Sequence, residues 1–424
     1  MEINLTLVVF ASNLHDNQSV SGSREALYSD FKKNYSLKIV SAQEYEPIKG
    51  QEEFAIAFIA TGGTEQLFLS NWQKISRPLV ILSDSFHNSL AATLEISSWL
   101  SGRKIKHKHL NFPINPTEDY MSNLHREISL LSNVHKAFKE ISTTKVGLIG
   151  EASPWLIASD VDKYSLTSRL GVKFIDIPIS SLEERFNNID TYSGKYALTS
   201  SESEKLITDY SKVIDGGRTK GDVIEAVKMY NAIKQIVQDN ELNAISIKCF
   251  DVIGTCKTTA CLALSILNDK GLVSGCEGDI PTLWSMIIAR ALLNKPVFMA
   301  NPSSIDRSTR SVDFAHCTTP LSFSDKFKLP SHFESGIGIG VAAELTLGNY
   351  TLFKCGGESL DIMFCASGRV VENTRVAERC RTQVKFVFDN EKEIDTFLNS
   401  HLGNHTILIP GNYIEELEHF FQLY

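Results

Sequence analysis

The spacing of hydrophobic residues changes near Pro320, and this change constrains the fold more than any other feature of the chain. Before Pro320, short apolar runs alternate with helical patterns, as the βα units of a parallel sheet require. After Pro320, segments with a period of two follow one another between glycine-containing turns, which is typical of a small antiparallel barrel or sandwich. Strands are predicted at residues 5–11, 54–60, 78–82, 146–150, 172–177, 244–249 and 297–300, and then at 337–347, 350–354, 360–365, 384–389 and 403–410.

This pattern predicts an α/β protein with two consecutive parallel-sheet α/β domains, followed by a small β-rich, barrel-like C-terminal domain. A chain of 424 residues is too long for one ordinary core, so two or three domains are expected. An amphipathic helix at 124–141 closes the first unit. The predicted domains therefore cover residues 1–142, 143–320 and 321–424, and a final helix lies at 413–423.

Composition and charge exclude several classes of protein. With 43% apolar and 22% charged residues the chain has the composition of a soluble globular protein, and its net charge of −8 argues against nucleic-acid binding. The densest basic run, at 104–108, is interpreted as a solvated loop. No apolar run reaches about 18 residues and the first residues lack a signal-peptide pattern, so we expect a cytoplasmic protein without membrane contact. The eight cysteines show no paired CxxC spacing, which favours buried free thiols.

Polar residues follow the apolar segments between Gly271 and Pro320. Glu277 lies in a predicted strand-to-helix loop, and Asp279 is a predicted N-cap for a buried helix at 280–293. Asn301 ends the short strand at 297–300, and His316 follows soon after. Because ligands bind at the carboxyl ends of strands in open parallel sheets, we expect Glu277, Asn301 and His316 around one crevice.

Four segments of the chain stand out together, and they are Cys276-Glu277-Gly278-Asp279, Phe298-Met299, Ala315-His316-Cys317 and Gly403-Asn404-His405-Thr406. In this order they resemble segments of the L-fucose isomerase and L-arabinose isomerase superfamily. The order of domains, βα, βα and then β, also matches the three-domain layout of those enzymes. The resemblance covers most of the chain, although the N-terminal region matches only in its pattern.

The resemblance implies a fucose isomerase-like sugar isomerase, an intramolecular oxidoreductase that depends on Mn²⁺ or another divalent cation. Such enzymes interconvert aldoses and ketoses through an enediol, and the substrate would be a pentose, a deoxyhexose or a modified sugar. Carried over to this chain, the metal ligands are Glu277, Asn301, His316 and His405. The family also implies a homo-oligomer.

One departure from the family pattern affects the predicted chemistry. The family has aspartate or glutamate where this chain has Asn301, and an asparagine side chain does not exchange protons near neutral pH. Either another acid replaces it, with Asp251, Asp279 and Asp306 as candidates, or the reaction differs. The alternatives are an epimerase, a carbon–carbon lyase, or a non-catalytic sugar-binding or regulatory homologue. We take Glu277, Asn301 and Asp251 as the catalytic candidates.

Each candidate also has a structural interpretation. Glu277 could be a carboxylate at a helix terminus, His316 and His405 core histidines, and Asn301 a turn residue before Pro302. His15 and His87 follow N-terminal strands and are weaker candidates for substrate contact. A group of arginines could hold an anionic substituent of the substrate or form a solvated face. The arginines are Arg369, Arg375, Arg379 and Arg381.

Overall fold

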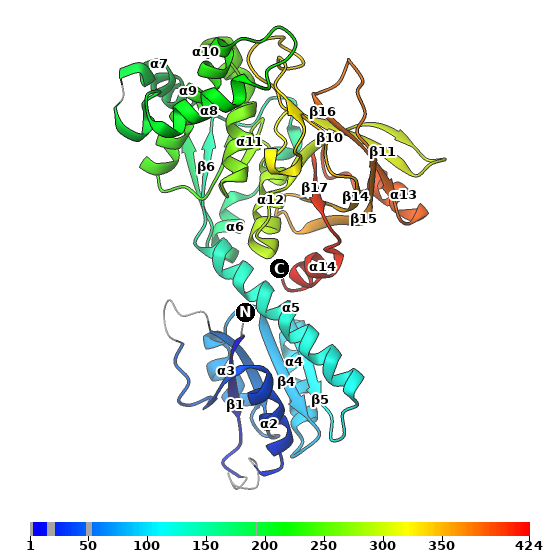
Figure 1. The fold of residues 1–424 in the computed structure, drawn as a ribbon. Coiled ribbons are helices and arrows are strands. Elements are labelled where there is room, and N and C mark those ends of the chain that lie inside the picture. Colours follow the sequence, from blue (N-terminus) through cyan, green and yellow to red (C-terminus); the bar gives the residue numbers. More distant parts are fainter. Residues whose placement is uncertain (1–2, 15–21, 48–52, 192) are drawn as a thin grey trace. The chain divides into compact units, whose positions relative to one another are not determined.

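A computed structural model describes residues 3–14, 22–47, 53–191 and 193–424 (Figure 1). The chain forms two compact units, Met1–Lys139 with Glu418–Tyr424, and Glu140–Leu417. His15, one of the weaker candidates, lies outside the described residues. In the described part of the chain, none of the helices has both the length and the apolar character needed to span a lipid bilayer.

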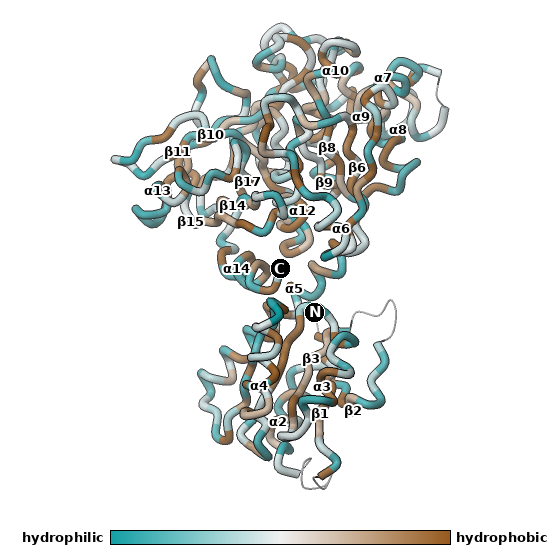
Figure 2. The backbone as a smooth tube through the Cα atoms, turned by 180° about the vertical axis from the view of Figure 1, so that it is seen from behind, coloured by the Kyte–Doolittle hydropathy of each residue, from teal (hydrophilic) through white to brown (hydrophobic). Residues whose placement is uncertain are grey.

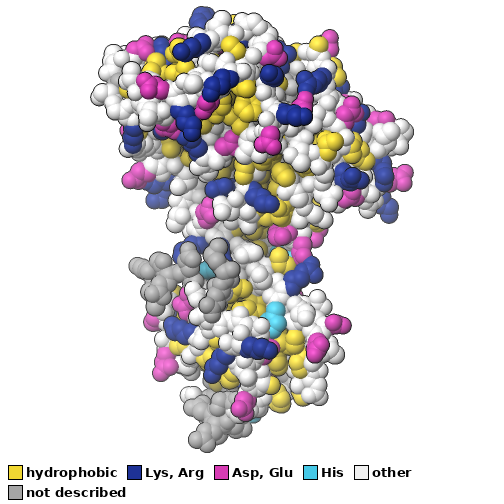
Figure 3. Space-filling view, in the orientation of Figure 1, with side chains coloured by type: hydrophobic (Ala, Val, Ile, Leu, Met, Phe, Trp, Pro, Cys, Tyr) yellow, Lys and Arg dark blue, Asp and Glu magenta, His cyan; other side chains and the backbone are white. Residues whose placement is uncertain are grey.

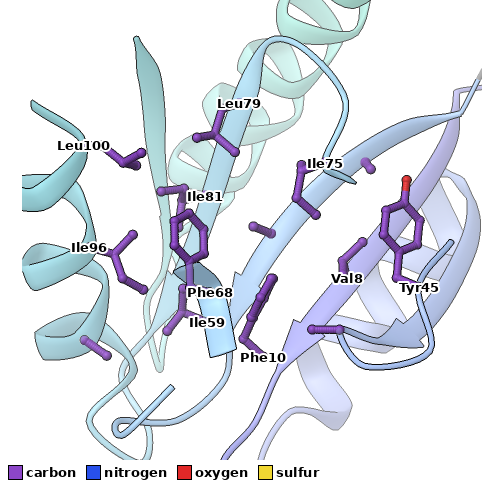
Figure 4. Packing of buried hydrophobic residues seen from close by; sticks show 14 residues of the cluster. Val8, Phe10, Tyr45, Ile59, Phe68, Ile75, Leu79, Ile81, Ile96 and Leu100 are labelled. Atoms are coloured by element: carbon purple, nitrogen blue, oxygen red, sulfur yellow. The ribbon is translucent and has the colours of Figure 1, made fainter. Parts of the chain in front are cut away.

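The N-terminal unit contains a five-stranded parallel sheet in the order β2-β1-β3-β4-β5. All six residues of β3 are buried, as expected for a central strand covered on both faces. Figure 4 shows Phe10, Phe68, Ile81 and Ile96 packed in the core beside this sheet. The strands are β1 (Asn4–Phe10), β2 (Ser36–Ser41), β3 (Phe54–Ile59), β4 (Leu79–Asp84) and β5 (His107–Phe112), and the helices are α2 (Glu25–Asn34), α3 (Glu65–Asn71), α4 (Ser89–Gly102), and parts of α5 (Glu118–Ser142) and α14 (Ile414–Leu423).

The second unit begins with a four-stranded parallel sheet in the order β7-β6-β8-β9. Helices α11 and α12 pack against β9, and α9 packs against α11. Figure 2 shows hydrophobic residues along α9 and the strands beside it. The strands are β6 (Lys145–Ile149), β7 (Lys173–Ile177), β8 (Ala244–Ile247) and β9 (Val273–Cys276), and the helices are α6 (Lys163–Leu170), α7 (Ile179–Asn188), α8 (Ser201–Ser211), α9 (Lys220–Asp239), α10 (Cys249–Cys256), α11 (Cys261–Asp269) and α12 (Ile280–Leu293).

A closed six-stranded antiparallel barrel follows in the order β10-β11-β16-β15-β14-β17. Helix α12 contacts both β14 and β17, so the barrel packs against the parallel-sheet part of the same unit. The strands are β10 (Phe298–Asp306), β11 (Ser311–His316), β14 (Gly348–Gly356), β15 (Ile362–Glu372), β16 (Thr382–Phe388) and β17 (Thr406–Pro410), with helix α13 (Glu391–Asn399) between the last two.

The structure confirms the predicted fold class, with parallel-sheet α/β parts and a C-terminal barrel. The placement of the strand predicted at 297–300 was wrong. It continues to Asp306 as β10, which pairs with antiparallel neighbours in the barrel, so Asn301 lies within a strand and not at the end of a parallel one. The predicted domain boundaries at 142 and 320 stay predictions, although β10 and β11 of the barrel precede residue 320.

Other differences have local causes. The edge strands β2 and β5 were missed because they are only partly buried and lack a clear apolar pattern. The basic run at 104–108 was interpreted as a loop, but its last two residues begin β5. The strand predicted at 337–347 is mostly irregular, and only Ala342–Ala343 forms a short strand, β13. Gly336 and Gly338 there adopt positive φ angles of 68° and 58°, which interrupt an extended strand.

Charged side chains of both signs are interspersed on the face of the molecule shown in Figure 3. A nucleic-acid-binding surface requires a concentration of lysine and arginine to neutralise phosphates. The visible face therefore agrees with the net charge of −8 in giving no indication of nucleic-acid binding.

The barrel's closure provides a test of the fold. Ile407 in β17 is fully buried, and this strand joins β10 to β14. Ile407→Ala should lower the free energy of unfolding by about 2–5 kcal/mol, because it removes buried methyl groups and leaves a cavity. The control is Ile362→Ala in β15, where the side chain is 54% exposed and the expected loss is below about 1 kcal/mol. Urea unfolding measures both, and equal losses would contradict the barrel.

Candidate functional site

Glu277 lies at a sharp turn between β9 and α12. Its φ angle is +63° and that of Gly278 is +74°, so the chain turns within two residues of the strand end. A side chain at Gly278 would meet the Glu151 carbonyl oxygen and the Ala152 Cα at 2.6 Å, which explains the glycine. The Ser153 amide donates a hydrogen bond to the Glu277 carbonyl oxygen at 2.9 Å. The turn and the loop after β6 therefore fix each other.

The Glu277 carboxylate faces two histidines that come from strands of the barrel. Its Oε1 atom lies 3.8 Å from Nε2 of His316, the last residue of β11, and 3.5 Å from Nε2 of His405, which precedes β17. The two imidazole rings meet edge to face with centroids 5.3 Å apart. On the other side, Trp155 Nε1 donates a hydrogen bond to Oε2 at 2.8 Å. Three segments distant in sequence thus meet at one carboxylate.

Asp279 performs two functions at the N-terminus of α12. Its Oδ1 accepts a hydrogen bond from the Thr282 amide at 2.7 Å, which is the predicted N-cap, and Pro281 follows in the first turn. Its Oδ2 lies 2.8 Å from Nδ1 of His405. The ammonium group of Lys354, on β14, is 3.7 Å from Oδ1 and also hydrogen-bonds to the Thr282 hydroxyl. Asp279 therefore links the helix to two barrel strands.

Burial and charge act in opposite directions on the ionisable groups of this cluster. Burial tends to raise the pKa of Glu277, but His316 and His405 outweigh it and hold the pKa below its usual range. For Asp279, burial again opposes ionisation, but Lys354 and His405 lower the pKa. Burial lowers the pKa of His316, whereas Asp279 and Glu277 overcome the burial of His405 and raise its pKa. Both carboxylates are therefore anionic at neutral pH.

The Nε2 atom of His405 is buried, and it has no hydrogen-bond partner in the described part of the chain. Its 3.5 Å separation from Glu277 is too long for one. His405 is fully buried, and such a polar atom normally has a partner. In a second grouping, ligand atoms of Cys276, Glu277 and His316 all lie within 4.8 Å of one another. These residues form a candidate metal centre, and Cys276 was missed by sequence reasoning.

The other predicted acids lie apart from this centre. Asp251, in α10, forms an ion pair with Lys248 at 3.2 Å. Asp306 is exposed at the end of β10 and accepts hydrogen bonds from Ser308. Asp251, Asp279 and Asp306 were the candidates to replace the missing carboxylate. Within the described part of the chain, Asp279 is the one of the three that contacts a predicted metal ligand, His405.

Asn301 is connected to the centre through a neighbour of His405. Its side-chain oxygen accepts a hydrogen bond from the Asn404 amide nitrogen at 3.0 Å. The register of the barrel explains this contact, because β10 pairs with β17 up to Ala300 opposite Thr406. Whether Asn301 is a ligand stays a prediction, and its observed contact is with the residue before His405.

Four further groups near the centre were missed by sequence reasoning. Trp155 and Lys354 carry no local signal, because each meets its partner across a long sequence separation. His332 packs edge to face against Phe250, and burial together with the charge of His316 lowers its pKa to about 4. Glu334 lies close enough to Glu277 that burial and this second negative charge raise its pKa. Glu334 thus differs from Glu277 and Asp279, whose pKa values are lowered.

Several of the weaker candidates have partners within the protein. Arg375 pairs with Glu344 and Arg379 pairs with Asp313, while Arg381 donates to the Ser331 carbonyl oxygen. His87 in the N-terminal unit lies 3.4 Å from the Arg24 guanidinium group. These contacts favour the structural interpretation of the arginines.

A pocket of about 800 Å³ adjoins the turn that carries Glu277. It lies at the carboxyl ends of the parallel strands, where open α/β sheets bind ligands. The Glu277 carboxylate itself is not part of its lining, but Gly278 and Ser153 are, so the pocket adjoins the loop that carries Glu277. The lining also includes Glu151, Asp160, Asp176 and Asp251.

The similarity of this chain to known proteins agrees with the geometry of the centre. A curated sulfoquinovose isomerase from Alkalicoccus urumqiensis is 23% identical over 260 residues, which are 57% of this chain and 57% of the relative. Those from Priestia aryabhattai and Priestia megaterium are each 28% identical over 189 residues, 44% of this chain and 40% of the relative. This chain resembles sulfoquinovose isomerases. It spans about half the length of the curated relatives it matches, and no protein-family profile matches it.

The double role of Asp279 predicts a large effect on stability. Asp279→Ala removes the cap, the partner of His405 and the counter-charge of the buried Lys354, so it should cost about 3 kcal/mol or more. Asp162→Ala is the matched control, because Asp162 caps α6 by accepting from the Ser165 amide at 2.9 Å. Loss of a cap alone costs about 1 kcal/mol. Urea unfolding measures the loss of stability in both variants, and similar losses would show that Asp279 acts only as a cap.

Proposed function

We propose that this protein is a metal-dependent aldose–ketose isomerase. The observation that carries the proposal is the convergence of one carboxylate and two buried imidazoles, Glu277, His316 and His405, at the carboxyl end of β9. The similarity to curated sulfoquinovose isomerases supports the reaction class. The superfamily resemblance supports it independently, because these residues lie in the segments that carry it.

The geometry of the centre fits a divalent cation. Two atoms that are each about 2.1 Å from one ion lie about 3.0–3.6 Å apart at angles of 90–120°. The distances from Glu277 Oε1 to the two Nε2 atoms, 3.8 and 3.5 Å, are close to this range. The unpartnered Nε2 of His405 provides a ligand atom that such an ion would satisfy. Carboxylate and imidazole suit Mn²⁺, and Cys276 would add affinity for softer ions.

Contacts at Nδ1 orient both histidines for this role. Nδ1 of His405 faces Asp279 Oδ2 at 2.8 Å, and Nδ1 of His316 faces the Thr318 hydroxyl at 2.8 Å. With its proton on Nδ1, each ring donates to that oxygen and directs the lone pair of Nε2 towards Glu277. Such contacts fix the tautomer of histidine ligands in metalloproteins. The Trp155 indole in the same way fixes the second oxygen of Glu277.

Isomerisation moves one proton between C2 and C1 of the sugar. A bound divalent cation would polarise the carbonyl and hydroxyl oxygens of the substrate. The chain must then provide a group that accepts the C2 proton and returns it at C1. We assign this role to Glu277, whose carboxylate is anionic at neutral pH. Glu334, whose pKa is raised by burial and by the charge of Glu277, is our candidate for the second proton-transferring group.

The substrate we propose is a six-carbon or five-carbon aldose, with a sulfonated sugar as the first candidate. The names of the curated relatives support a sulfonated sugar, and the superfamily resemblance supports a pentose or deoxyhexose. A homo-oligomer remains part of the proposal on the same resemblance. A clean monomer in sedimentation at micromolar concentration would contradict that part alone.

Metal affinity tests the centre directly. Asn301→Asp adds a carboxylate beside a site that holds one carboxylate and two neutral imidazoles, so it should tighten Mn²⁺ binding about tenfold, as roughly 1.4 kcal/mol of added attraction would give. Glu277→Gln should nearly abolish binding. Asp306→Asn is the control for a change of charge, because Asp306 is exposed at the far end of β10, and it should bind Mn²⁺ as the unchanged protein does. Calorimetric titration measures all four proteins.

The proposal fails if Glu277→Gln binds Mn²⁺ normally and Asn301→Asp leaves the affinity unchanged. In that case the cation site lies elsewhere and the residues cannot be carried over from the superfamily.

Catalysis is tested by proton exchange. In heavy water with Mn²⁺, an isomerase should incorporate deuterium at C2 of its aldose substrate or at C1 of the ketose, and removal of the cation with a chelator should stop the exchange. A panel with sulfoquinovose, fucose, arabinose and glucose separates the substrate classes by mass spectrometry. Binding without exchange for every sugar would instead favour a non-catalytic sugar-binding protein.

A further inference from the structure

Two buried thiols lie side by side, and one of them belongs to the residue directly before Glu277. Cys276 is the last residue of β9 and Cys249 is the first residue of α10, and their Sγ atoms are 2.8 Å apart. Parallel pairing brings them together, because Ile247 in β8 lies opposite Cys276. The sulfur atoms of a disulfide are about 2.05 Å apart, so bond formation requires a movement of less than about 1 Å.

We propose that Cys249 and Cys276 form a reversible disulfide when the protein meets hydrogen peroxide. In the first step one thiol gives up its proton and its sulfur attacks one peroxide oxygen, so that an S–O bond forms, the O–O bond breaks, and the departing hydroxide takes the proton and leaves as water. In the second step the other sulfur attacks the first, the S–S bond forms, the S–O bond breaks and a second water leaves. The two thiols together lose two electrons and two protons, and one peroxide becomes two waters. A small-molecule dithiol reverses the reaction by exchange.

Residues close to this pair in sequence line a pocket. The cysteines are only 6% and 4% exposed, which protects them from bulky reagents. However, Asp251 and Gly278, each two residues from one of the cysteines, line the pocket of about 800 Å³. Peroxide is hardly larger than water, so it can reach the end of the sheet through this pocket.

A second group of thiols provides an internal comparison. Cys317 follows His316 and is hydrogen-bonded by Cys380, which is more exposed than Cys249 or Cys276. If exposure alone governed oxidation, Cys380 would react before the Cys249–Cys276 pair. If the short sulfur–sulfur distance governs it, Cys249 and Cys276 will be linked first.

The bond would connect β9 to α10 one residue before Glu277. The backbone there already turns through a positive φ of 63°, so a link at the preceding residue limits how Glu277 adjusts to a ligand. An effect on bound cation rests on the proposed function. The disulfide itself rests only on the thiol geometry, so its formation can be tested even if the proposed function fails.

The test uses the full-length protein, reduced and then exposed to increasing hydrogen peroxide. Free thiols are blocked with N-ethylmaleimide in denaturant, disulfides are reduced, and the released thiols are labelled with iodoacetamide before peptide mass spectrometry. Cys249 and Cys276 should move together from the first label to the second, by one equivalent each, and dithiothreitol added before blocking should restore the first label. A cross-linked peptide should be present before reduction. The proposal is overturned if both cysteines keep the first label at peroxide levels that oxidise Cys380.

Two variants complete the test. Cys249→Ser leaves Cys276 without its thiol neighbour, so iodoacetamide labelling of Cys276 should be lost. Cys355→Ser is the matched control, because Cys355 is fully buried beside the Ser285 hydroxyl, and labelling of the pair should persist. Persistent labelling of Cys276 in Cys249→Ser would overturn the assignment of its partner. If that variant does not fold, the cross-linked peptide of the unchanged protein still decides.

Discussion

The ion pair between Asp279 and Lys354 is the constraint on which the centre depends. Both side chains are almost fully buried, at 3% exposure each, and a buried charge without a partner is strongly destabilising. Asp279 fixes the start of α12, and Lys354 belongs to β14 of the barrel. The pair therefore requires the helix and the barrel to pack in one arrangement. His405, the third partner of Asp279, is positioned by the same requirement.

This arrangement explains how a centre can be assembled from two different types of sheet. Glu277 directly follows a parallel strand, whereas His316 ends the antiparallel barrel strand β11 and His405 directly precedes the barrel strand β17. Helix α12 lies between these parts and contacts strands of both. The turn at Glu277 needs only one positive-φ residue and one glycine to aim its carboxylate at the barrel. The ends of these rigid elements thus set the positions of Glu277, His316 and His405, and the loop after β6 contributes Trp155.

Sequence reasoning could predict the residues with strong local patterns. The cap at Asp279 followed by Pro281 gave the start of α12, and the change of hydrophobic period gave the barrel. Glu277, His316 and His405 were found through the order of segments that resemble a superfamily, and the structure places them together. Lys354 could not be found, because a lysine within an apolar strand gives no indication that its partner is 75 residues away at Asp279. Asn301 was misplaced because its short apolar run fits a parallel strand as well as a barrel strand.

The proposed function requires that Glu277, His316 and His405 bind a single divalent cation. Anomalous scattering at the manganese absorption edge, from crystals grown with Mn²⁺, measures this most directly. We expect one strong peak within about 2.5 Å of Glu277 Oε1 and of both Nε2 atoms. A peak at another group of side chains, or no peak at this centre in Mn²⁺-saturated crystals, would contradict the claim.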